Sequence, residues 1–149
     1  MKGLEKLLRN LENVGGNAPK VMEKGVKQGL KLIQGNAKLL APVDSGELRN
    51  SIQTRTQIDG GKVTGEVYTP CGHAVYVELG TGQRGENSPI EVPPNLAGKI
   101  HYKQDWKGQP AQPYMYPAAK AAEPKIPGIV VAAVQKEIVK LAKGGGVGG

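Results

Sequence analysis

Apolar residues return every three or four positions over two long stretches of the chain, which predicts two amphipathic helices. The first is expected to have Asn17 as its cap and to run to about Leu40, before Pro42. Its predicted core face carries Met22, Val26, Leu30, Ile33, Ala37 and Leu40. The second is expected from about Gly128 to Lys143. Its predicted core face carries Val130, Val131, Val134, Ile138 and Leu141.

Between these helices, two short runs alternate apolar and polar side chains and so predict a β-hairpin. The runs Ile52–Ile58 and Val63–Val67 flank a turn formed by Asp59-Gly60-Gly61. The largely apolar run Ala74–Gly80 fits either a strand or a short helix. Together these elements predict an α+β fold, in which a small antiparallel sheet packs against the long N-terminal helix and the C-terminal helix.

The remaining segments are irregular or short. A leucine stripe predicts a helical segment within residues 1–16, and the glycine-rich residues 144–149 suggest a flexible tail. Residues 81–112 show no period and predict a long extended loop of the kind that is usually functional or disordered. After it a helix is expected to begin with Pro117 in its first turn. Pro124 and Pro127 are expected to interrupt the helical structure before the final helix. A length of 149 residues favours one domain.

The distribution of charge gives the first long helix a basic face. The chain has a net charge of +7, and residues 1–40 hold eight Lys or Arg against three Glu. Five lysines fall on the face opposite the predicted core, namely Lys20, Lys24, Lys27, Lys31 and Lys38. Such a stripe is either a solvated face or a surface for DNA phosphates, so a basic nucleic-acid-binding module stays open as an alternative function.

Small residues form a strip along the same helix, with Gly25 and Gly29 at its centre. Each glycine costs the helix roughly 1 kcal/mol relative to alanine. Either a close-packed neighbour compensates for this cost, or the helix is only marginally stable. The first interpretation makes the two glycines candidates for a subunit interface.

The triplet Asp44-Ser45-Gly46 matches the active-site turn of an aspartic protease, but its surroundings favour a structural role. Asp44 follows a helix rather than a strand. With Glu47 three residues later, it matches the capping pattern at a helix start. We therefore interpret Asp44 as a cap and keep a protease only as a distant alternative.

Other candidate chemistry is weak. Cys71, His73 and His101 are too few for a zinc site without suitably spaced carboxylates, and the single cysteine excludes a disulfide within the chain. The glycines of residues 80–86 lack the Lys-Ser/Thr pair of a phosphate-binding loop. No apolar run approaches the ~20 residues of a membrane span. We expect no catalytic, cofactor or metal site and no membrane partner.

Three separated motifs resemble those of one family, and they occur in the same order. The motifs are "APVDSGELRNSI", "AVYVELGT" and "QPYMYPA", the last preceded by "YKQDWKG". They are similar to the tail-completion, or neck, proteins of long-tailed bacteriophages and prophages, and the likeness covers residues 37–122. Ser45, Leu79 and Tyr114 are conservative departures from the usual Thr, Phe and Phe of the family.

The resemblance implies a non-enzymatic structural subunit of the virion, assembled in the host cytoplasm. About six copies would form a ring at the head–tail joint, between the head-side connector or stopper and the tail tube or tail terminator. DNA would pass through the lumen, where the five lysines named above could meet it. The turn after the long helix would be ordered by Pro42, Asp44, Gly46, Glu47 and Arg49. The candidate subunit or partner contacts are Gly25, Gly29, Tyr76, Glu78, Trp106, Tyr114 and Tyr116.

Overall fold

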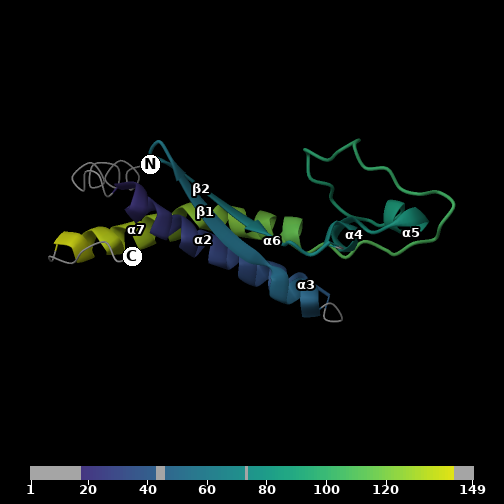
Figure 1. Cartoon of the computed structure of the whole chain (residues 1–149), viewed down its shortest axis with the longest axis horizontal. Coiled ribbons are helices and arrows are strands. Elements are labelled where there is room, and N and C mark those ends of the chain that lie inside the picture. The colour runs from purple at the N-terminus through teal and green to yellow at the C-terminus, as the bar shows by residue number, and fades with distance from the viewer. Residues whose placement is uncertain (1–17, 43–45, 73, 143–149) are drawn as a thin grey trace. The chain divides into compact units, whose positions relative to one another are not determined.

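The computed structural model describes residues 18–42, 46–72 and 74–142 and confirms the α+β class (Figure 1). A long helix, a two-stranded antiparallel sheet and a C-terminal helix are all present. The elements are α2 (Ala18–Leu40), α3 (Gly46–Ser51), β1 (Gln53–Asp59), β2 (Lys62–Tyr68), α4 (Ala74–Leu79), α5 (Gly82–Glu86), α6 (Met115–Ala122), the 3-10 helix η2 (Glu123–Lys125) and α7 (Ile126–Ala142). The predicted segment 1–16, the caps Asn17 and Asp44 and the tail 144–149 lie outside the described residues.

The chain divides into two compact units. Residues 18–33, 54–67 and 122–142 form the first, which we call the hairpin unit. Residues 34–42, 46–53, 68–72 and 74–121 form the second, which we call the loop unit.

In the hairpin unit, α2 lies alongside α7 (Figure 1). Val21 and Val134 are fully buried between the two helices. Partly buried apolar side chains pack around them, namely Ala18, Met22, Val130, Val131, Ile138 and Leu141. This packing confirms the predicted core face of the C-terminal helix. On α2 the buried face differs from the prediction, because Val21 belongs to it and Leu40 is exposed.

The hairpin uses a second face of α2. A Cβ atom built at Gly65 of β2 would lie 2.7 Å from Val26 Cγ1 and 2.8 Å from Leu30 Cδ1. Only glycine allows the strand to approach the helix this closely. The turn after β1 has Gly60 at φ 56° and Gly61 at φ 84°, as the predicted two-glycine hairpin turn requires.

Of the two C-terminal prolines that were predicted to interrupt the helical run, Pro124 lies where α6 gives way to a 3-10 turn, whereas Pro127 lies inside α7 and does not interrupt it. Pro124 lies in η2, and Pro127 is the second residue of α7, so α7 begins two residues before the expected Gly128. Ala122 and Ile126, which flank η2, both have right-handed helical dihedral angles. Proline is tolerated in a first helical turn because the amides there have no partner within the helix.

In the loop unit, the ambiguous run Ala74–Leu79 is the helix α4, which ends at Gly80. Gly80 has φ 76°, and its amide donates to the Tyr76 carbonyl at 2.8 Å, which is a common way to close a helix. Among the described helices, none is long and apolar enough to cross a membrane.

The long loop closes on itself and contains the short helix α5, which the sequence pattern did not predict. Thr81 and Gln109 exchange backbone hydrogen bonds at 2.9 and 3.1 Å, and the Gln83 amide donates to the Trp106 carbonyl at 2.9 Å. Gly82 and Gly108 have positive φ angles where these two loop segments approach each other. A Cβ atom at Gly82 would lie 2.5 Å from the Trp106 oxygen. The two glycines therefore permit the loop to close.

Candidate functional site

A single carboxylate joins two of the motifs noted in the sequence. Glu78 of α4 accepts hydrogen bonds from the backbone amides of Tyr114 at 3.2 Å, Met115 at 2.7 Å and Tyr116 at 3.3 Å. The first amides of a helix have no acceptor within that helix, and a negative charge also suits its dipole. Glu78 thus caps the start of α6 from 36 residues away.

Tyr114 lies in the interior beside this cap, with only 2% of its surface exposed. Burial, helped by the nearby Glu78 carboxylate and by Cys71, raises the pKa of Tyr114 to about 12. Its hydroxyl donates to the Ala74 carbonyl at 3.4 Å. The structure therefore accounts for Glu78 and Tyr114, which the sequence assigned to an interface, by contacts within the chain.

Gly25 and Gly29 also have their close neighbour within the chain. A Cβ atom at Gly25 would lie 2.8 Å from Val134 Cγ2, and one at Gly29 would lie 3.1 Å from Ile126 Cδ1. The predicted close-packed neighbour thus exists, and it is α7 of the same chain.

Tyr76 and Trp106, by contrast, are more than half exposed. They line a cavity of about 300 Å³ that we call the aromatic groove. Its apolar wall comes from α4 and from the long loop: Val75, Tyr76, Leu79, Ile100, Tyr102 and Trp106. The Tyr102 hydroxyl donates to the Leu79 carbonyl at 2.9 Å and holds the loop against α4. Burial, with a contribution from Glu86, raises the pKa of Tyr102.

Tyr116, the last of the predicted interface residues, is half-buried in α6. The Lys120 ammonium lies 5.9 Å from the centre of its ring and forms an ion pair with Glu91. The positive charge of Lys120 is therefore already paired with Glu91 and lies near the Tyr116 ring, on the surface of the loop unit. Tyr116 is therefore less available to a partner than Tyr76 or Trp106.

The C-terminal end of α2 carries the most exposed large apolar residue of the described chain, Leu39, at 82%, and a corner follows it. Leu48 of α3 and the adjoining Ile52 are fully buried and hold the corner in place, and Gln34 donates to the Ile52 carbonyl at 2.8 Å. Gly46 and Glu47 are exposed and Pro42 is half-buried. The Arg49 Nε atom is buried without a hydrogen-bond partner among the described residues.

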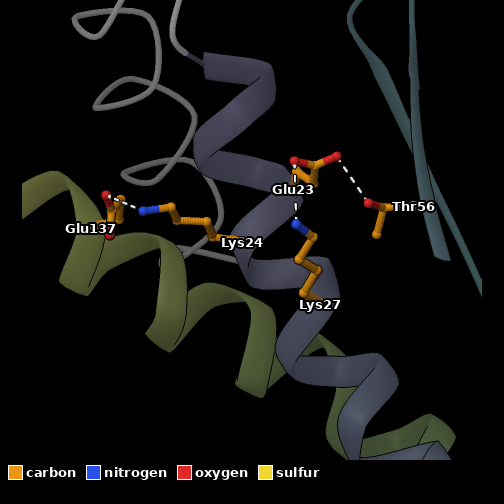
Figure 2. Close-up of polar contacts among 5 residues, drawn as sticks. All are labelled: Glu23, Lys24, Lys27, Thr56 and Glu137. Atoms are coloured by element: carbon orange, nitrogen blue, oxygen red, sulfur yellow. Dashed lines mark hydrogen bonds and ion pairs between the residues drawn. The ribbon is translucent and has the colours of Figure 1, made fainter. Parts of the chain in front are cut away.

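The five lysines of α2 do not share one role, and Figure 2 shows the contacts of two of them, Lys24 and Lys27. Lys24 forms an ion pair with Glu137 of α7 at 3.0 Å, and the Glu137 side chain is only 10% exposed. Lys27 lies 3.8 Å from Glu23, which also accepts a hydrogen bond from Thr56 of the hairpin at 2.9 Å. Lys24 therefore serves the helix packing, whereas Lys27 makes a surface pair of small energy.

The other three lysines differ in exposure. Lys20 and Lys31 are exposed, as Lys27 is, and Lys38 is half-buried. Of the three exposed lysines, Lys27 is the one that lies near a carboxylate of the described chain, that of Glu23. In the described part of the chain, no group of three or more His, Cys, Asp or Glu side chains could hold a metal ion.

Sequence reasoning missed most of the aromatic groove. Val75 is 25 or more residues away from Ile100 and Tyr102 along the chain, and those two lie in the irregular loop, where no period marks them. Leu39 was missed because the helical period ran through its neighbour Leu40.

The comparisons with known proteins place the chain in a class, namely the structural components of bacteriophage tails. Residues 5–80, just over half of the chain, match a family model described as "Bacteriophage HK97-gp10, putative tail-component". The chain belongs to this HK97 gp10-like family, which confirms the resemblance seen in the sequence. The comparisons with curated proteins and with solved structures found no match.

Proposed function

We propose that this chain is a non-enzymatic subunit of the head–tail joint of a tailed bacteriophage. Copies of it, expected to number six, form a ring that completes the tail and joins it to the head connector. Membership of a phage tail-component family is the observation that carries the proposal. A tail component assembles with other virion proteins, so its place of action is the virion.

The distribution of exposed apolar surface supports an assembly role. Seven large apolar side chains are exposed among the described residues, and five of them lie on the loop unit: Leu39, Leu40, Val75, Tyr76 and Trp106. Exposed apolar residues that gather in this way commonly mark surfaces for other proteins. On the proposed joint, this unit contacts neighbouring copies, the connector or stopper above and the tail tube or terminator below.

The exposed lysines support passage of DNA through the ring. Lys20 and Lys31 of α2 can meet phosphates without breaking an ion pair among the described residues, unlike Lys24. Contacts of this kind are independent of base sequence and weaken with salt. They suit DNA that must slide past the ring during ejection.

The proposal is tested with particles that lack this protein. They are expected to accumulate as filled heads and separate tails, because the joint cannot form, and purified protein should restore joining. Electron microscopy of the restored particles should show a ring of density at the neck. Heads and tails that join normally without the protein, or density along the tail tube, would contradict the neck assignment and leave the family membership unchanged.

A further inference from the structure

The aromatic groove favours an occupant that is apolar and carries negative charge. Its wall is formed by aliphatic and aromatic side chains, and the ionisable groups among its lining residues, tyrosines aside, are His101 and Lys103. Lys99 and Lys107 are exposed on the same stretch of loop, in which Asp105 is the one acidic residue. A cavity of about 300 Å³ is at the small end for ligand sites and suits one or two side chains.

The loop unit also carries exposed apolar residues close in sequence to an exposed carboxylate. We call this set, Leu39, Leu40 and Glu47, the leucine corner. Leu39 and Leu40 end α2, and Glu47 is exposed in the first turn of α3. Between Leu39 and Leu48 the sequence contains acidic residues but no Lys or Arg. The half-buried Lys38 precedes the corner. Within nine residues of sequence, the leucine corner therefore carries two exposed leucines and an exposed carboxylate, so it matches the apolar wall of the groove and is opposite to its basic residues in charge.

We propose that the leucine corner of one copy inserts into the aromatic groove of the next copy, with Glu47 facing Lys103. This inference rests on the ring proposed above and names the contact that builds it. Because groove and corner are different surfaces of the same chain, each copy donates one and accepts with the other. Such a head-to-tail contact repeats and generates a ring when the rotation closes. A twofold dimer would instead pair identical surfaces.

The first experiment compares two aspartate substitutions at exposed apolar positions. Leu39→Asp lies in the leucine corner, and Val139→Asp lies on α7 of the hairpin unit, where 53% of the side chain is exposed. Leu39→Asp is expected to raise the concentration for half-assembly by about tenfold or more, as for loss of an interface anchor. Val139→Asp should leave it within about twofold of wild type, and circular dichroism should show both variants folded.

Trp106 reports the occupancy of the groove directly, since it is the only tryptophan. In wild-type protein its emission should shift to the blue on assembly, as the corner of the next copy excludes water. In Leu39→Asp the red-shifted emission should persist at the concentrations where wild type assembles. Assembly of wild type without a change in this emission would overturn the proposed contact.

A photo-crosslinking amino acid in place of Trp106 identifies the occupant in joined particles and in purified protein. The expected product joins two copies through the peptide that contains Leu39 and Leu40. Crosslinks to another virion protein or to DNA would overturn the contact, as would rings that form normally with Leu39→Asp, while the ring itself would stand. Wild-type protein that does not self-associate in either sample would overturn the ring together with the contact.

Discussion

The two units of this chain are stabilised in different ways. In the hairpin unit, α2 packs its apolar side chains and its glycines against α7 and β2. In the loop unit, a carboxylate and three positive-φ glycines organise the backbone: Glu78 caps α6, and Gly80, Gly82 and Gly108 allow close crossings. The stability of the hairpin unit therefore depends on close packing of side chains. That of the loop unit depends on hydrogen bonds to the backbone and on glycines that allow backbone segments to approach each other.

The difference also extends to the surfaces. The hairpin unit carries the exposed lysines Lys20 and Lys31, whereas the loop unit carries the aromatic groove and the leucine corner. In the proposed joint, contact with DNA and contact with protein partners would therefore fall on different units. Substitution of a tightly packed glycine in the hairpin unit and of a capping or buried polar residue in the loop unit should therefore lower stability by different amounts.

The largest effect is expected from Gly25→Leu in the hairpin unit. A side chain at this position meets Val134 and Val130 at 2.8 to 3.0 Å, so α2 and α7 must move apart. We expect a loss of about 3 kcal/mol in the free energy of unfolding, measured by denaturant titration. Gly35→Leu is the matched control on the same helix, because nothing lies within 4 Å of its Cβ atom. Equal losses in both variants would show that helix packing at Gly25 is not tight.

An intermediate effect is expected from Glu78→Ala in the loop unit. The substitution leaves three amides at the start of α6 without their charged acceptor and should cost about 2 kcal/mol. Glu78→Gln keeps one acceptor oxygen and should lose roughly half as much. Glu123→Ala, at an exposed position of η2, serves as the control and should change stability little. If Glu78→Ala were as stable as this control, the cap would not organise the unit.

The smallest effect at neutral pH is expected from Tyr114→Phe, at about 1 kcal/mol, because a single long hydrogen bond is lost. The pH dependence is more informative. The pKa of Tyr114 rises from about 10 in the unfolded chain to about 12 in the folded chain, so burial favours the neutral phenol. The associated stability is complete below pH 10 and is lost as the pH rises through 12.

Tyr114→Phe should therefore lose less stability than wild type between pH 10 and 12. Ultraviolet titration of the wild type should show one tyrosine ionising near pH 12 that is missing in the variant. Identical alkaline unfolding in the two proteins would mean that water reaches Tyr114 and that the joint between α4 and α6 is open.

The sequence was a good guide where structure depends on neighbours along the chain. The period of α2 and α7, the two glycines of the hairpin turn and the start of α6 near Pro117 were all predicted and are present. The start of α7 was misplaced by two residues, since Pro127 was taken as a break although a first helical turn accepts it. The family motifs also indicated the phage tail class before any contact was known.

Contacts between residues that are distant in the sequence could be identified only from the tertiary structure. A glycine strip predicts that something packs closely, but only the fold shows that Gly25 meets α7 of the same chain. Glu78 was named as a candidate contact residue only through the family resemblance. The fold instead brings the amides of α6 to it. Periodicity fixes which face of an element is apolar, because it depends on local backbone geometry. It carries no information on what covers that face, because that depends on loop closure and on packing between residues far apart in the chain.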